Sequence, residues 1–241
     1  MFFVQVLLCY GTYTNLELLE HYGFLLPYNP NDKVHMRLPS TDELSPGDSW
    51  VSQETISLKN IYIDYKGQPS FSLLLYLRLA AAPATLRKSR RHLAFAGQQI
   101  SPESDLVVYQ WLKTKCHHML MSFPTSILVD ELLFAILKVY QSTEEVRNFW
   151  SVRKEEDITS ASRVPSEALE GVSSEVQEIV KHELENFLES VSLKGELSKG
   201  RKTSLAEDLR FERWKLAIEW RLGHKKILDR CISHCSFMLR R

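Results

Sequence analysis

The feature that most constrains the fold is a turn segment near the start of the chain, residues 10–24, which follows a short apolar run. The length and the aromatic and β-branched content of that run predict a buried β-strand over residues 2–9. Residues 15–21 then have the spacing of a short amphipathic helix, with Thr14 or Asn15 as its N-cap. Because a strand end holds side chains rigidly and leaves them accessible to solvent, this turn is the first candidate functional site.

The segment that follows predicts a small amount of further β-structure. Gly23 suits the left-handed position at which the short helix ends. Apolar and polar residues then alternate over residues 33–38 and 60–65, which predicts two half-buried strands separated by a loop over residues 39–49. Turns rich in Asn, Pro and Gly precede the first strand, at residues 29–32, and follow the second, at residues 66–69.

From Ser70 onward the apolar residues recur with a helical period, so the fold is expected to be mainly α. Ser101 is expected to cap one of these helices, with Pro102 in its first turn. Residues 153–171 have no such period and are expected to form a polar linker or mobile loop. The predicted helices cover residues 70–82, 84–96, 101–121, 126–149, 173–192 and 204–238.

The last two predicted helices carry opposite charge. Residues 165–192 contain seven acidic and one basic residue, a net charge of −6, whereas residues 201–241 contain eleven basic and five acidic residues, a net charge of +6. We therefore expect these helices to be antiparallel neighbours in a bundle, with charges flanking an apolar seam. The basic surplus of the C-terminal helix then needs no nucleic acid to explain it.

The overall charge excludes partners that depend on a strong electrostatic field. The 241 residues include 30 Lys and Arg and 30 Asp and Glu, so no basic excess points to nucleic acid or to an acidic membrane surface. The apolar run at the N-terminus is too short to span a bilayer. Four cysteines without a disulfide framework favour a reducing compartment, but the sequence does not distinguish nucleus, cytoplasm and chloroplast. It also leaves the oligomeric state open.

Three other motifs have a chemical and a purely structural interpretation. Residues 116–118 (Cys-His-His) and residues 231–235 (Cys and His-Cys) contain possible zinc ligands, but their spacing is not a standard one. Buried helical thiols are the favoured interpretation, and no metal site is predicted. The basic run at residues 87–92 is compatible with nuclear targeting or a phosphate site, although a solvated helix face is the commoner explanation.

The turn segment resembles a known family. The pattern Tyr10-Gly11-Thr12-x-x-Asn15-x-Glu17-Leu18-Leu19, followed by Tyr22-Gly23-Phe24, is similar to the closing segment of the SET domain in rubisco large-subunit methyltransferase-like lysine methyltransferases. Within that family the sequence resembles the plant SET domain group forty branch. Residues 29–34 also fit the family pattern, and residues 61–79 resemble the entry into its helical substrate-binding module.

The resemblance implies a fold, a cofactor and a set of site residues. Residues 1–30 would be the C-terminal remnant of a SET domain, and residues 31–241 an all-helical domain that binds a protein substrate bearing a lysine. The cofactor of the family is S-adenosyl-L-methionine. The implied site consists of Tyr10 as the catalytic tyrosine, Tyr13 and Tyr22 as substrate-binding residues, and Gly23, Phe24 and Leu25 against the cofactor, with Phe24 near the adenine.

The sequence also departs from the family pattern. It contains no Asn-His pair, which the family uses with an upstream glycine-rich loop to hold the methionine part of the cofactor. We therefore expect a C-terminal portion of a methyltransferase, a truncated product or an isoform, that is inactive alone. The alternative is a non-catalytic helical protein-interaction module in which Tyr10 is a half-buried structural residue.

Overall fold

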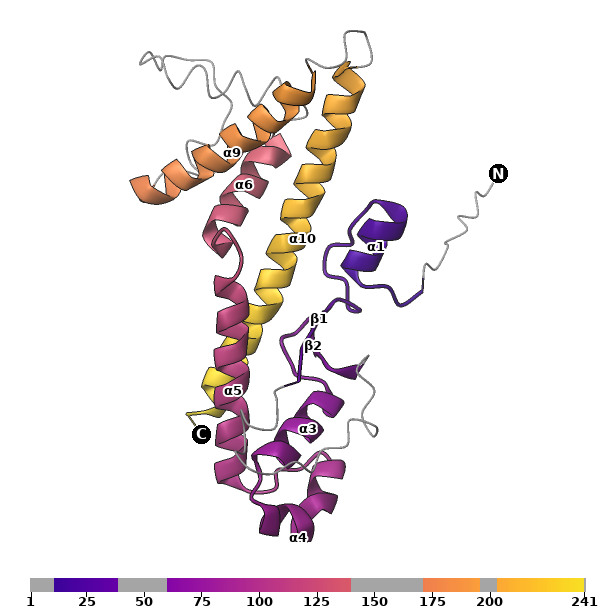
Figure 1. Cartoon of the computed structure of the whole chain (residues 1–241), viewed down its shortest axis with the longest axis vertical. Helices are drawn as coiled ribbons and strands as arrows, with labels where there is room; N and C mark the ends of the chain where they lie inside the picture. The colour runs from indigo at the N-terminus through magenta and orange to yellow at the C-terminus, as the bar shows by residue number, and fades with distance from the viewer. Residues whose placement is uncertain (1–10, 39–59, 140–170, 196–202, 241) are drawn as a thin grey trace, which may run out of the picture. The chain divides into compact units, whose positions relative to one another are not determined.

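The structure, a computed structural model, describes residues 11–38, 60–139, 171–195 and 203–240 (Figure 1). It is mainly helical, which confirms the predicted fold class. The predicted strand over residues 2–9, the loop over residues 39–49 and almost all of the predicted linker lie outside the described residues. The chain divides into two compact units, of which unit 1 contains Met1–Phe123 and His224–Arg241 and unit 2 contains Pro124–Gly223.

The two strands of unit 1 are shorter than the alternating segments that predict them. Strand β1 (Lys33–His35) pairs antiparallel with β2 (Tyr62–Asp64), and Val34 and Ile63 face each other in the register. Both side chains are buried, as expected for the apolar positions of an alternating strand. Beyond β1 the pairing continues through a backbone bond from the N–H of Met36 to the carbonyl of Ile61.

The apolar side chains of unit 1 gather in two buried clusters, a larger one and a smaller one. Helix α1 (Asn15–Tyr22) lies in the turn segment and is followed after the strands by α3 (Phe71–Ala81), α4 (Ala84–Phe95) and α5 (Pro102–Met121). The C-terminal part of α10 (Thr203–Met238) completes the unit. The smaller cluster, which includes Leu79 and Ala94, lies between α3 and α4. The most deeply buried members of the larger cluster include Val34, Ile63, Leu73, Leu77, Val108, Leu112, Cys116, Leu228 and Cys231.

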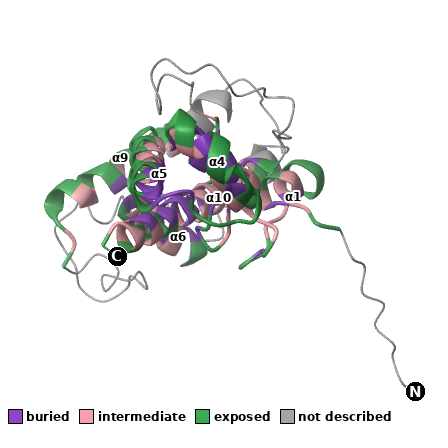
Figure 2. Ribbon diagram, turned by 90° about the horizontal axis from the view of Figure 1, so that it is seen from below, coloured by how far each residue is buried: buried purple, intermediate pink, exposed green. Residues whose placement is uncertain are grey.

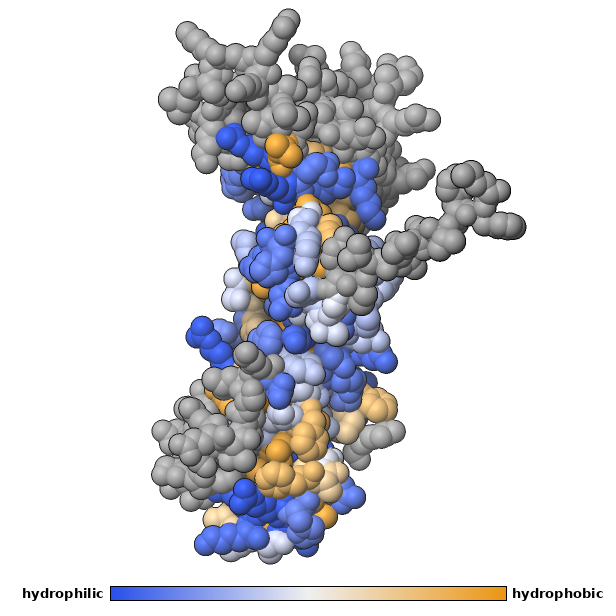
Figure 3. Space-filling view, turned by 90° about the vertical axis from the view of Figure 1, so that its right-hand side faces the viewer, coloured by the Kyte–Doolittle hydropathy of each residue, from blue (hydrophilic) through white to orange (hydrophobic). Residues whose placement is uncertain are grey.

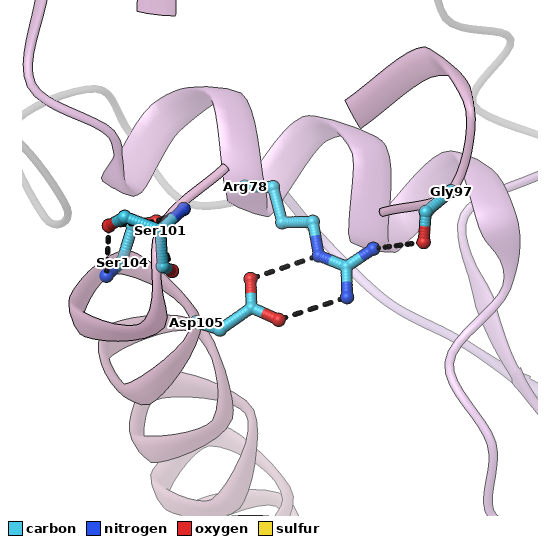
Figure 4. Close-up of polar contacts among 5 residues, drawn as sticks. All are labelled: Arg78, Gly97, Ser101, Ser104 and Asp105. Atoms are coloured by element: carbon cyan, nitrogen blue, oxygen red, sulfur yellow. Dashed lines mark hydrogen bonds and ion pairs between the residues drawn. The ribbon is translucent and has the colours of Figure 1, made fainter. Parts of the chain in front are cut away.

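A buried ion pair joins α3 to α5 inside unit 1. The Arg78 guanidinium donates from Nε to Asp105 Oδ1 at 3.0 Å and from Nη2 to Asp105 Oδ2 at 2.9 Å. Its remaining Nη1 group donates to the carbonyl of Gly97 at 2.7 Å, in the turn between α4 and α5 (Figure 4). At the start of α5, Ser101 caps the helix and Pro102 occupies the first turn, as predicted.

The described part of unit 2 contains α6 (Ile127–Val139), α9 (Ser174–Gly195) and the first part of α10. Helices α9 and α10 run in opposite directions (Figure 1) and contribute to the same core, which confirms the predicted neighbours. Phe187 of α9 stacks on Trp214 of α10 with ring centroids 4.0 Å apart. Two of the ion pairs on these helices, Lys181–Glu178 and Lys215–Glu212, form within one helix, and the contact between α9 and α10 described here is aromatic.

Unit 2 also contains a buried charge pair. Asp130 on α6 is fully buried and accepts from the Arg221 guanidinium of α10 and from the Thr125 hydroxyl at 2.7 Å. None of the helices in the described ranges is long and apolar enough to cross a membrane.

Candidate functional site

The structure gathers three of the predicted site residues into one aromatic cluster, which we define as Tyr13, His21, Tyr22 and Phe24. The Tyr13 and Tyr22 ring centroids lie 5.9 Å apart, and those of Tyr22 and Phe24 lie 6.2 Å apart. His21 approaches both tyrosines. Tyr22 is 46% exposed and Tyr13 and Phe24 are half-buried, so the cluster borders solvent. The predicted catalytic residue, Tyr10, lies outside the described residues.

Helix α1 holds the cluster because both of its ends are capped. The Thr14 hydroxyl accepts from the N–H of Glu17, and the Glu17 carboxylate accepts in return from the Thr14 backbone N–H at 2.7 Å. Thr14, rather than Asn15, is therefore the N-cap. The bond from the Thr14 N–H, with a second from its hydroxyl, lowers the pKa of Glu17. Gly23 ends the helix at φ +74°, as predicted from the sequence.

Asn15 ties α1 to the chain that follows the cluster. Its side-chain Nδ2 donates to the Leu26 carbonyl at 3.1 Å, and its Oδ1 accepts from the Leu26 N–H at 3.0 Å. This pair of bonds imitates backbone pairing and closes a loop from residue 15 to residue 26. All three tyrosine and phenylalanine members of the cluster are in or next to this loop. Asn15, a fixed position of the family pattern and a possible cap in the sequence, is thus a positioning residue.

Two further polar residues extend this network to β1. Asn29 is buried and donates from Nδ2 to the Tyr13 carbonyl at 2.9 Å. Asp32 accepts from the backbone N–H of Asn15 at 3.2 Å and from its side chain at 3.3 Å. Burial raises the pKa of Asp32, although bonds from Asn15 and from the Lys33 N–H oppose that shift. The predicted turn over residues 29–32 is present, closed by a bond from the Asp32 N–H to the Asn29 carbonyl.

The chemistry available at the cluster is aromatic and polar rather than ionic. The hydroxyls of Tyr13 and Tyr22 can donate and accept hydrogen bonds, and the ring faces can stack on a planar group. Residues 10–26 contain no Lys or Arg, so His21 is the one side chain of this segment that can carry a positive charge toward a bound carboxylate. Close by, Tyr28 adopts φ +57° and is 95% exposed.

The cysteines of the two Cys/His motifs lie in the core of unit 1, whereas the two histidines of the first motif are exposed. Cys116, Cys231 and Cys235 are fully buried, and the sulfurs of the last two lie 4.0 Å apart. The hydrogen bond to Cys116, together with burial, raises the pKa of the Cys231 thiol well above its usual range. His117 and His118 are exposed. Within the described ranges no group of three or more His, Cys, Asp or Glu side chains is arranged to hold a metal ion.

The comparisons with known proteins agree with this architecture. The family model described as Rubisco LSMT substrate-binding matches residues 48–228, which is most of the chain. "Protein SET DOMAIN GROUP 40" from Arabidopsis thaliana is 37% identical over 235 residues, which cover 96% of this chain and 42% of that protein. The chain therefore spans less than half the length of this relative. These matches confirm the resemblance seen in the sequence: the chain belongs to the Rubisco LSMT substrate-binding family and is similar to a SET domain group protein.

Proposed function

We propose that this chain supplies the protein-substrate-binding module of a SET-type protein-lysine N-methyltransferase, together with the turn that closes its methyl-transfer pocket. The observation that carries the proposal is the family match over residues 48–228. The aromatic cluster supports the second part, because residues 13, 22 and 24 of the motif lie together at a solvent-exposed edge. The substrate is a protein that presents a lysine side chain.

In this proposal the turn aligns a lysine amine rather than activating it chemically. S-adenosylmethionine supplies the methyl group on a positively charged sulfur. The Tyr10 hydroxyl accepts a hydrogen bond from the neutral amine and so fixes its line of approach. Tyr22 lines the channel through which the lysine enters, and Tyr13 contacts the substrate peptide. The Asn15 bonds to Leu26 hold these rings in place.

The turn provides only part of a cofactor site. Gly23, Phe24 and Leu25 offer an apolar and aromatic wall that suits an adenine ring. The carboxylate of the cofactor needs a cation or several N–H donors, and residues 10–26 contain no Lys or Arg. We therefore propose that the chain alone does not hold the cofactor and does not methylate protein. The lack of Lys and Arg in residues 10–26 also favours a second candidate function, a non-catalytic helical interaction module in which Tyr10 is structural.

A chimera tests the proposal. In "Protein SET DOMAIN GROUP 40", the matching 42% of the protein is replaced by this chain, and cofactor binding is measured by isothermal titration calorimetry. Transfer of labelled methyl groups to lysine-bearing proteins is measured in parallel, and the isolated chain is assayed beside the chimera. We expect the chimera to bind the cofactor and transfer methyl groups, and the isolated chain to do neither.

Two matched substitutions separate the catalytic from the structural role of Tyr10. Tyr10→Phe in the chimera is expected to lower the transfer rate about a hundredfold at unchanged cofactor affinity, a loss of the size seen when a transition-state hydrogen bond is removed. Tyr28→Phe, which removes a hydroxyl from a 95% exposed ring, is the control and is expected to leave the rate unchanged. Full activity of Tyr10→Phe would favour the interaction module. Methyl transfer by the isolated chain would refute the proposed inactivity.

A further inference from the structure

The basic run at residues 87–92 lies on α4, and its residues have different environments in the structure. Residues 84–100 contain four Lys or Arg and no Asp or Glu. Arg87 is buried and donates from Nη2 to the Ala82 carbonyl at 2.7 Å, beyond the start of the helix. Arg90 donates to the Ile100 carbonyl at 3.3 Å. These two arginines serve the packing of α4, which the sequence alone does not reveal.

The remaining basic residues of the run point away from the core. Lys88, Arg91 and His92 are exposed and, with Phe95, follow the i, i+3, i+4 and i+7 spacing that places side chains on one helix face. We call these four residues the α4 face. Within the part of the chain that the structure describes, neither Lys88 nor Arg91 has an acidic partner. Figure 2 shows much of α4 as exposed, and the lowest part of Figure 3 shows hydrophilic surface beside hydrophobic surface.

The α4 face combines charge with accessible aromatic surface. Phe95 is 44% exposed, and the Arg91 guanidinium lies over its ring, with Cζ 5.1 Å from the centroid. This cation–π contact restrains the guanidinium, so less side-chain freedom is lost when Arg91 binds an anion. Phe71, at the start of α3, is 55% exposed, and one of its ring atoms lies 3.7 Å from the position that a side chain on Gly97 would occupy. Apolar surface therefore borders the cations.

We propose that the α4 face binds an acidic segment of the protein substrate, a segment that also carries an apolar side chain. This inference rests on the proposed function and adds the chemical class of the substrate. From Lys88 to Phe95 the helix rises about 10 Å, the reach of roughly three extended residues. Carboxylates of the segment pair with Lys88 and Arg91, and its apolar side chain covers Phe95. A nucleic acid is the weaker candidate, because the chain has no net charge to attract a polyanion.

Binding of short fluorescein-labelled peptides to the full chain tests this inference by fluorescence anisotropy. One peptide contains Asp and Glu with two Leu, a matched peptide replaces each acid by its amide, and a single-stranded oligonucleotide serves as the phosphate probe. We expect the acidic peptide to bind most tightly and to weaken as salt is raised. Equal binding of the amide peptide, or preference for the oligonucleotide, would overturn the proposal, as would the absence of binding by the acidic peptide.

Charge reversal locates the site. Lys88→Glu/Arg91→Glu is expected to weaken binding of the acidic peptide by at least about tenfold, because two attractions become repulsions. Phe95→Ala is expected to weaken it about threefold through lost apolar contact. The control, Arg37→Glu/Arg213→Glu, makes the same change of net charge at two exposed residues elsewhere and should leave the affinity unchanged. Equal losses in both charge-reversed variants would mean that net charge, not the α4 face, governs binding.

The same variants separate this inference from the proposed function. In the methyl-transfer assay with the chimera, Lys88→Glu/Arg91→Glu should raise KM for an acidic protein substrate at unchanged kcat. If the chimera transfers methyl groups with an unaltered KM, the α4 inference fails and the proposed function stands. If the chimera transfers none while the acidic peptide still binds the α4 face, the proposed function fails instead.

Discussion

At Gly67 the turn after β2 packs tightly against α10, and replacing this glycine by alanine tests how unit 1 is assembled. Gly67 has φ +81°, and an added Cβ would lie 2.6 Å from the Arg230 Cβ and 2.6 Å from the Cys231 backbone nitrogen. Both distances are shorter than Cβ contacts in folded proteins allow. Because these atoms belong to the body of a helix, rotation of a flexible side chain cannot relieve the overlap.

The expected cost has two parts that a second glycine separates. Left-handed backbone costs an alanine about 1–2 kcal/mol, and forcing a methyl group into a packed interface adds about 1–3 kcal/mol. Gly23→Ala meets the first cost alone, because Gly23 has φ +74° and nothing lies within 4 Å of its added Cβ. We therefore expect Gly67→Ala to destabilise unit 1 by about 2–5 kcal/mol and Gly23→Ala by about 1–2 kcal/mol.

Urea denaturation followed by circular dichroism measures both variants. Since the chain has two units, amide hydrogen exchange of residues 224–238 is recorded as well, because it reports on unit 1. In Gly67→Ala the protection of these residues should fall together with the stability. Equal destabilisation by the two alanines would refute the close packing of the turn on α10 and leave only the backbone conformation.

Three further substitutions test the network, the ion pair and the histidines. Asn15→Ala removes two hydrogen bonds to Leu26 and should cost about 1–3 kcal/mol, seen as faster hydrogen exchange over residues 13–26. The control Asn31→Ala, whose side chain makes neither of these bonds, should leave the exchange unchanged. Arg78→Met leaves the buried Asp105 carboxylate unpaired and should lower the free energy of unfolding by about 3–5 kcal/mol. The double variant Arg78→Met/Asp105→Leu should recover most of the lost stability, and an absence of recovery would contradict the pairing. Burial lowers the pKa of His224 and of His234 below the ordinary 6.5. At pH values below about 6.5 the folded chain therefore binds fewer protons than the unfolded chain, and its stability should fall as the pH drops. Thermal melts of His224→Gln/His234→Gln across that pH range should show little of this dependence of stability on pH.

The histidine prediction follows from the groups that face each ring. His234 contacts the Gln68 side chain through Nδ1 at 3.2 Å and the Tyr109 ring edge to face, and Asp64 is the nearby charge that opposes the lowered pKa. His224 lies against the Phe123 ring. In both places protonation adds a charge to a largely apolar or already hydrogen-bonded environment, which is why acid should destabilise the fold.

The sequence by itself determined the helical architecture and the recognition of the family. Helical periodicity and capping residues predicted α3, α4 and α5 to within a residue or two of their observed ends, because Ser70, Ser101, Pro102 and Gly97 act through their immediate backbone neighbours. The string around residues 10–24 identified the family for a similar reason, since a motif is local. The predicted roles of Tyr10, Tyr13, Tyr22, Gly23, Phe24 and Leu25 stay predictions.

Only the tertiary structure decided which polar residues meet. Asn15 and Leu26 are eleven residues apart, and nothing in either one indicates a paired contact. The basic run on α4 appears uniform in the sequence, yet Arg87 is buried and Lys88 is not. Likewise the thiols of Cys116, Cys231 and Cys235 come together between α5 and α10, and Arg78 pairs with Asp105, which lies 27 residues further along the chain. Such pairings depend on how helices pack against one another, and helical periodicity indicates which face is buried but not what lies opposite it.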